Sequence, residues 1–303
     1  MAKRPLINHM KYIYSSICVL FFSCSSPDKP KTISVEIPIL TETNHEKIEA
    51  IYYGVPSPME TTIILKNNCP IFSNDVLFPD IISGHLNNKQ STAILLGIIS
   101  ADLNYAILSD RPHETSILMN KVINLAKLLH LDAVVNENIK QRVENNLSNK
   151  DSMQIIIGNT FWEIENKLKQ DENYKSSAMI ITGGWLEGIY LACKMAKLYP
   201  ENHGINNVVA EQKFVLENLI ELNSEFKFDE HIHELIINDL IKLKSIYENV
   251  TIEYTNPKST SEEENSNEIV IGNYFNLKFD VQDIEKIDNL VNELRNKVIT
   301  QLL

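Results

Sequence analysis

Glycine, cysteine and basic residues are all scarce in this chain of 303 residues. It has nine glycines and four cysteines, and 28 basic residues stand against 40 acidic ones, a formal charge of −12. So few glycines disfavour a loop-rich enzyme, and so few cysteines exclude a disulfide scaffold. Binding to phosphates needs clustered lysine and arginine, so the acidic balance predicts no nucleic-acid partner. Hydrophobic residues make up 44% of the chain, enough to bury one large core.

The first 24 residues have the pattern of an export signal. Three basic residues precede an apolar run at 12–22, which ends in Leu-Phe-Phe-Ser-Cys at 20–24. The run is shorter than the roughly 20 residues that cross a bilayer, but it suits the core of a cleaved signal peptide. Its end resembles the lipobox in which a bacterial lipoprotein cysteine receives diacylglycerol. We expect a lipoprotein signal peptide over 1–23 and lipidation at Cys24; the alternative is an ordinary secretory signal with a chance cysteine.

The rest of the chain is expected to form a tether and one domain. Residues 24–45 are rich in proline and small polar residues, which is typical of a flexible tether. Residues 46–303 are expected to be a single helical domain. Within it, 255–267 has no apolar face to bury and is expected to be a disordered excursion.

The periodicity of the domain predicts an all-α, multi-helix bundle of about eight to ten helices, because apolar residues recur at three- and four-residue spacing. Capping boxes at 57–60 and at 151–154 predict helix starts near 58 and 152. β-Branched and aromatic residues at 250–254 and 269–279 are compatible with a small β-hairpin near 250–279. The expected helices are 47–53, 58–67, 91–109, 113–130, 136–148, 152–171, 176–198, 206–224, 229–249 and 282–302.

Two of these helices, 91–109 and 176–198, are apolar around almost their whole circumference. Such helices are buried on all sides, so we expect these two at the centre of the bundle. They also resemble one another at an offset of 85 residues, and each is followed by an amphipathic helix. The alternatives are a duplicated helical unit or coincidence between two apolar helices.

A carboxylate lies in the middle of each central helix, Asp102 in the first and Glu187 in the second. An unpaired charge there would cost several kcal/mol, so each acid needs a partner. The candidates are Tyr105 and Tyr190, at i+3 from the acids, and Arg295, which lies among apolar residues of the last helix. Three roles stay open: a polar contact that fixes helix register, a ligand pocket between the two central helices, or acid–base chemistry.

Three glycines and Trp185 lie at 182–188 inside the second central helix. Each glycine costs roughly 1 kcal/mol relative to alanine in a helix. Close approach of the other central helix, which carries Gly97, would offset this cost, and so would a ligand against bare backbone. Trp185 therefore joins the candidate ligand-binding residues.

Motifs for common enzyme chemistry are missing from the sequence. His231 and His233 would lie about 200° apart on a helix and so do not predict a metal site. Dinucleotide, esterase and metalloprotease motifs do not occur. We expect no catalytic residue, no metal and no cofactor. Cys69 and Cys193 are expected to be buried thiols, although a disulfide between them stays open.

Several segments together resemble a family of uncharacterised, all-helical lipoproteins of the Bacteroidetes cell envelope. Gly97–Asp102 departs in part from the pattern expected of that family. The resemblance implies an all-helical fold and an envelope location, and it implies no known activity. The matching segments are Tyr53 with Pro56–Glu60, Leu96-Gly97 with Ala101–Ala106, Gly183–Tyr190 and Glu293–Arg295.

These observations predict an envelope lipoprotein, anchored through Cys24 in the outer membrane and facing the periplasm, that acts as a helical binding or scaffolding module and not as an enzyme. Its partners would be the membrane that holds the lipid anchor and either an envelope protein or a small ligand. The alternative is a periplasmic small-molecule binding or sensing protein with its pocket between helices 91–109 and 176–198. A hydrolase that uses Asp102 or Glu187 is the third hypothesis.

Overall fold

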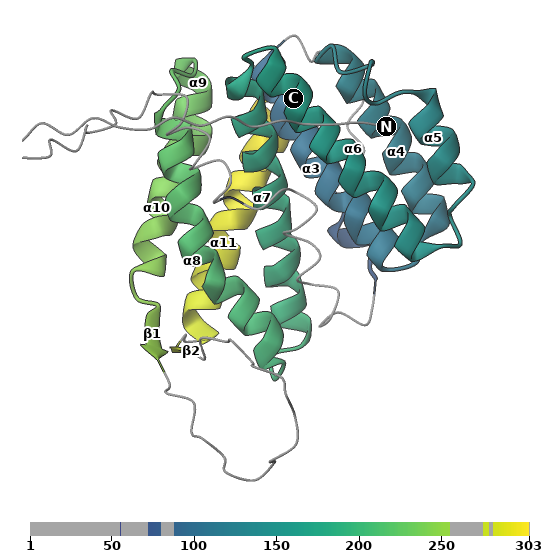
Figure 1. The fold of residues 1–303 in the computed structure, drawn as a ribbon. Coiled ribbons are helices and arrows are strands. Elements are labelled where there is room, and N and C mark those ends of the chain that lie inside the picture. The colour runs from purple at the N-terminus through teal and green to yellow at the C-terminus, as the bar shows by residue number, and fades with distance from the viewer. Residues whose placement is uncertain (1–54, 56–71, 80–87, 255–274, 279–280, 303) are drawn as a thin grey trace, which may run out of the picture. The chain divides into compact units, whose positions relative to one another are not determined.

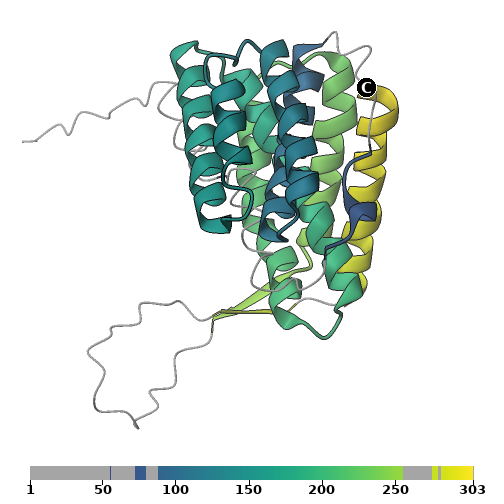
Figure 2. The same cartoon turned by 90° about the vertical axis from the view of Figure 1, so that its right-hand side faces the viewer.

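The computed structural model describes Val55 and residues 72–79, 88–254, 275–278 and 281–302. In this part the chain is a bundle of helices that run up and down beside one another (Figures 1 and 2), so the predicted all-α class is confirmed. The helices are η1 (Asn74–Val76), α3 (Lys89–Leu108), α4 (Pro112–Leu128), α5 (Glu137–Glu144), α6 (Lys150–Gln170), α7 (Tyr174–Leu198), α8 (His203–Ser224), α9 (Glu230–Ile232), η2 (His233–Ile237), α10 (Asn238–Tyr247), α11 (Val281–Lys297) and η3 (Val298–Leu302).

The predicted helices from 91 onward are confirmed, with ends shifted by a few residues. Helix 229–249 is α9, η2 and α10 in succession, where η2 is a π-helical turn. The predicted hairpin is also present, with β1 (Thr251–Tyr254) antiparallel to β2 (Phe275–Lys278). The predicted helices 47–53 and 58–67, the signal peptide, the tether and the excursion 255–267 lie outside the described residues.

Asparagine begins most of the long helices. The side chain of Asn149 accepts a hydrogen bond from the backbone N–H of Ser152, so α6 starts at 150, two residues before the predicted start near 152. Asparagine oxygen caps the exposed N–H groups of a first helical turn as well as serine does. The other asparagine N-caps are Asn88, Asn136, Asn173 and Asn202.

At the C-terminal ends of three helices, residues other than glycine occupy the left-handed position, which fits the scarcity of glycine in the chain. Asp110, His130 and Glu172 follow α3, α4 and α6 with φ of 57°, 60° and 54°. In this left-handed region glycine is the usual residue, and other residues bear a cost of roughly 1–2 kcal/mol. The bonds that close these ends, such as Arg111 N–H to Ala106 O at 3.0 Å, offset that cost.

Helices α3 and α7 form the centre of the bundle, as predicted. Every residue from Ser91 to Leu108 is buried. Helix α3 is long and apolar enough to cross a membrane, but it is fully enclosed by the protein, as the core helix of a globular domain is. Helices α4, α6, α8 and α11 pack around this pair. The pair also positions the candidate site, because both central acids lie on it.

Candidate functional site

The centre of the candidate site is a buried ion pair between Glu187 on α7 and Arg295 on α11, and α3 contributes the third residue of the site, Asp102. The Nε and Nη2 groups of Arg295 donate to the two carboxylate oxygens of Glu187, each at 2.8 Å. The side chains are 7% and 0% exposed. Two parallel N–H···O bonds to one carboxylate give this pair strength and a fixed orientation. The predicted buried cation is thus found, and its partner is the acid of the second central helix.

Arg295 is enclosed by rings and by backbone as well as by its acid. Its guanidinium carbon lies 3.9 Å from the centre of the Tyr190 ring and 4.9 Å from that of Phe78. Its Nη2 also donates to the Val76 carbonyl at 3.1 Å. Aromatic faces attract a cation most strongly where water is excluded. The short segment 72–79 therefore covers the arginine, a role that the sequence pattern did not reveal.

Asp102 completes the cluster from α3. Its Oδ2 accepts a 2.8 Å hydrogen bond from the backbone N–H of Phe78, whereas its buried Oδ1 has no donor. Burial, and next the negative charge of Glu187, raise the pKa of Asp102 well above its usual value. A proton on Oδ1 would make Asp102 a donor to Glu187, which lies within hydrogen-bonding reach. The cluster then contains one negative and one positive charge.

This arrangement joins helices rather than presenting a reactive group. Asp102, Glu187 and Arg295 are buried and are held on α3, α7 and α11. With a proton on Asp102 the charges balance within the cluster, because Arg295 pairs with Glu187. The polar contact that fixes helix register is the role these contacts favour.

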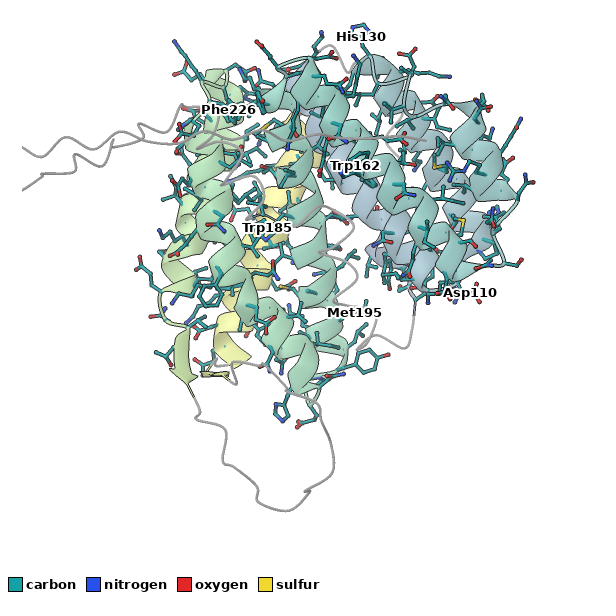
Figure 3. The ribbon with its side chains drawn as sticks, in the orientation of Figure 1. Asp110, His130, Trp162, Trp185, Met195 and Phe226 are labelled. Carbon is teal, nitrogen blue, oxygen red and sulfur yellow. The ribbon has the colours of Figure 1, made fainter. Side chains whose placement is uncertain are left out.

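Two other predicted site residues lie in separate contacts. The Tyr105 hydroxyl accepts from the backbone N–H of Ser73 at 3.3 Å, and its ring stacks on Phe72. Trp185, which is labelled in Figure 3, is fully buried. It donates its Nε1–H to Gln212 on α8 at 2.9 Å. Tyr190 meets the cluster with the face of its ring, which lies on Arg295.

The glycines serve close approach of the two central helices. A Cβ atom on Gly97 would lie 1.9 Å from the carbonyl oxygen of Ile180, and one on Gly183 would lie 2.0 Å from that of Ile94. Backbone therefore packs on backbone, which leaves no space at this crossing for the pocket predicted between helices 91–109 and 176–198. The pairing of 97 with 180–184 and of 102 with 187 also shows that α3 and α7 run parallel. Residues related by the predicted duplication thus face each other, although the duplication itself stays a prediction.

Two further acids that are almost completely buried were missed in the sequence. Asp288 on α11 bonds Lys194 at 3.0 Å and also pairs with Lys197, and both lysines are on α7. Asp239 on α10 pairs with Lys242 and Lys297. Each of these acids is 1% exposed. The signal that selected Asp102, an acid among apolar residues at helical spacing, is present at both positions.

The remaining predicted positions carry little chemistry. Cys193 is a buried free thiol, as predicted, and burial raises its pKa. Cys24 and Cys69 lie outside the described residues, so lipidation is not tested. Among the residues that the structure describes, no group of three or more His, Cys, Asp or Glu side chains is arranged to hold a metal.

One family resembles part of the chain. Residues 207–299 match the model of a family described as the N-terminal domain of 8-oxoguanine DNA glycosylase. The matched range covers just under a third of the chain and runs from α8 through α11. Neither the curated proteins nor the solved structures include a significant match.

This match contradicts the interpretation of the chain as an envelope lipoprotein. The resemblance to Bacteroidetes lipoproteins, the outer-membrane location, the envelope scaffolding role and its two alternatives are therefore wrong, since the match points to DNA repair. The exclusion of a nucleic-acid partner is wrong for the same reason. It rested on net charge alone, and net charge bears on non-specific attraction to phosphates and not on the fold of a segment.

Proposed function

We propose that this protein is a DNA-associated helical protein of the DNA-repair type. The observation that carries the proposal is the match of residues 207–299 to the N-terminal domain of 8-oxoguanine DNA glycosylase. The matched range takes in almost all of α8, the helices from α9 to α10, both hairpin strands and the whole of α11.

The matched residues are neighbours in space as well as in sequence, which supports the proposal. Helix α10 packs against both α8 and α11, and β2 contacts α8. The Tyr247 hydroxyl donates to the Val209 carbonyl at 2.8 Å, and Lys213 donates to the Val250 carbonyl at 2.8 Å. A match that coincides with a packed unit has a structural meaning that a scattered match would lack.

The charge of the matched segment determines how it could contact DNA. Residues 207–299 contain 19 acidic and nine basic residues, a formal charge of −10. Five of the nine basic side chains are already paired with acids, namely Lys242, Lys244, Lys286, Arg295 and Lys297. Few phosphates can therefore be neutralised, and each neutralised phosphate contributes about one unit to the salt dependence of binding. We expect weak binding that depends only slightly on salt.

Fluorescence anisotropy with the full chain tests the proposal. Labelled duplexes with a central 8-oxoguanine or guanine pair are titrated between about 50 and 200 mM salt. We expect saturable binding, with a slope of log affinity against log salt no steeper than about −3. No change in anisotropy up to about 100 μM protein at the lowest salt would refute the proposal.

A pair of charge reversals locates the contact. Lys227 is exposed within the matched segment, and Lys127 is exposed on α4 outside it. Lys227→Glu should weaken binding several-fold, whereas Lys127→Glu should leave it almost unchanged. Equal effects of the two changes would show that net charge, and not the matched segment, controls binding.

A further inference from the structure

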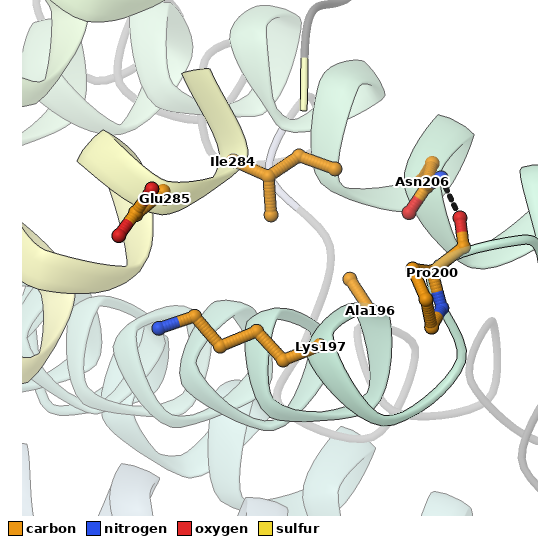
Figure 4. Close-up of a pocket in the computed structure, with 6 residues that line it drawn as sticks. All are labelled: Ala196, Lys197, Pro200, Asn206, Ile284 and Glu285. Atoms are coloured by element: carbon orange, nitrogen blue, oxygen red, sulfur yellow. Dashed lines mark hydrogen bonds between the residues drawn. The ribbon is translucent and has the colours of Figure 1, made fainter. Parts of the chain in front are cut away.

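A small cavity lies where the C-terminal end of α7, the first turn of α8 and the first turns of α11 meet (Figure 4). Its volume is about 220 Å³. Ala196, Pro200 and Ile284 give it an apolar lining, and Asn206, Lys197 and Glu285 add polar groups. This cavity is separate from the Asp102 cluster and shares no residue with it.

One polar atom of the lining lacks a partner. The Asn206 side chain donates through Nδ2 to the Pro200 carbonyl at 3.1 Å, which fixes the orientation of its amide. Its Oδ1 is buried and has no hydrogen-bond donor. In Figure 4 this oxygen is directed toward the space bordered by Ile284 and Ala196. A buried acceptor without a donor costs free energy, and a ligand that supplies a donor would recover it.

The lysine at the other end of the cavity is already paired. Lys197 pairs with Asp288, and the nearby carboxylate of Glu285 further favours its charged form. In Figure 4 the Lys197 side chain extends away from Asn206, toward Glu285. The space beside Asn206 therefore offers apolar surface and a single acceptor, and the charged side chains lie at the far end of the cavity.

We infer that this cavity binds a small, uncharged and mostly apolar molecule that carries one N–H or O–H donor, of the class of indoles and phenols. The donor hydrogen-bonds to Asn206 Oδ1, and the apolar body packs on Pro200, Ala196 and Ile284. A cavity of about 150 Å³ lined by aliphatic side chains is large enough to bind benzene. The larger cavity here accommodates one ring or two fused rings. This binding is independent of the proposed association with DNA.

Isothermal titration calorimetry with two probes tests the inference on the full chain. Indole has the ring N–H, and 1-methylindole presents the same rings without a donor. We expect indole to bind at least about tenfold more tightly, since one hydrogen bond to a buried acceptor is worth about that factor. Equal affinities, or no binding of indole at its solubility limit, would overturn the inference and indicate that water fills the cavity.

Variants assign the preference to one side chain. Asn206→Ala should bring the affinities for the two probes to within about twofold of each other. Asn207→Ala is the matched control, because Asn207 is the next residue of α8 and is exposed; it should keep the preference for indole. If Asn206→Ala does not fold, the comparison of the two probes on the unaltered protein still decides. An unchanged preference in folded Asn206→Ala would refute the role of its oxygen.

Discussion

Replacing Arg295 by methionine removes the cation of the buried cluster while nearly keeping its volume. Glu187 then stays buried, without the two 2.8 Å bonds that satisfy its carboxylate. Breaking a buried ion pair by removing one partner costs about 3–5 kcal/mol, because the remaining charge is uncompensated. For a helical domain of this size that loss lowers Tm by roughly 6–20 °C. Urea unfolding followed by circular dichroism at pH 7 measures the free energy.

The pH dependence distinguishes a lost charge partner from lost packing. In Arg295→Met, Glu187 avoids the cost of an unpaired charge by binding a proton. At pH 4 a glutamate of the unfolded chain, whose ordinary pKa is 4.5, is already mostly protonated, so the charge penalty disappears. We therefore expect the destabilisation to shrink as the pH falls from 7 to 4. A second change, Glu187→Leu in the same chain, should recover at least about 2 kcal/mol at pH 7.

Arg142→Met is the control, because Arg142 is exposed on α5 and its loss should change stability by no more than about 0.5 kcal/mol. If Arg295→Met costs no more than this control, the ion pair does not stabilise the fold. A large cost that is the same at pH 4 and pH 7 would refute the charge argument and leave packing as the cause.

Three other substitutions test neighbouring parts of the structure, each by urea unfolding. In Asp102→Asn the new amide can still accept from the Phe78 N–H and donate to Glu187. Because the pKa of Asp102 is raised in the folded protein, the natural protein loses stability as pH rises from 3.8 toward that pKa, and the variant should gain relative stability over this range. A stability difference that is constant with pH would contradict protonation of Asp102. Gly97→Ala should cost more than about 3 kcal/mol despite the better helix propensity of alanine, because its Cβ would lie 1.9 Å from the Ile180 carbonyl oxygen; a neutral result would contradict the backbone contact. Asp288→Asn should cost about 1–2 kcal/mol at pH 7, a modest value because the two lysines that pair with Asp288 are partly exposed. The pKa of Asp288 is lowered in the folded protein, so this stabilisation is lost as pH falls through that pKa, below 3.8. An equal cost at pH 2 would contradict the ion pairs.

Much of the fold could be predicted because each helix has a local pattern of apolar and polar residues in the sequence. The spacing of apolar residues identified α3 to α11, and the absence of a polar face identified α3 and α7 as central. The start of α6 was predicted two residues late because Asn149 and Asp151 both have capping side chains. Which of two nearby caps is used depends on how the preceding loop packs, and the local pattern does not contain that information.

The candidate site could be predicted only in part, because its contacts are distant in sequence. Asp102, Glu187 and Arg295 could be predicted as buried polar residues, since each one lies among apolar residues at helical spacing. The same pattern did not identify Phe78. Its backbone N–H donates to Asp102, and its ring lies beside the guanidinium of Arg295. A backbone donor can belong to any residue, so composition and spacing could not select it. Tyr105 shares the spacing of Tyr190, but it faces Phe72 instead.

The matched segment 207–299 does not behave as an independent domain in this structure, because several of its buried polar groups are satisfied by α7. Arg295 needs Glu187, Gln212 accepts from Trp185 and Asn223 donates to the Thr182 hydroxyl at 2.9 Å. Cutting the segment away would leave a buried cation and two buried amides exposed or unpaired, while removing apolar surface that α7 covers. If α8–α11 contact DNA as proposed, that contact depends on the whole bundle, and a change in α7 should weaken it by loosening α11.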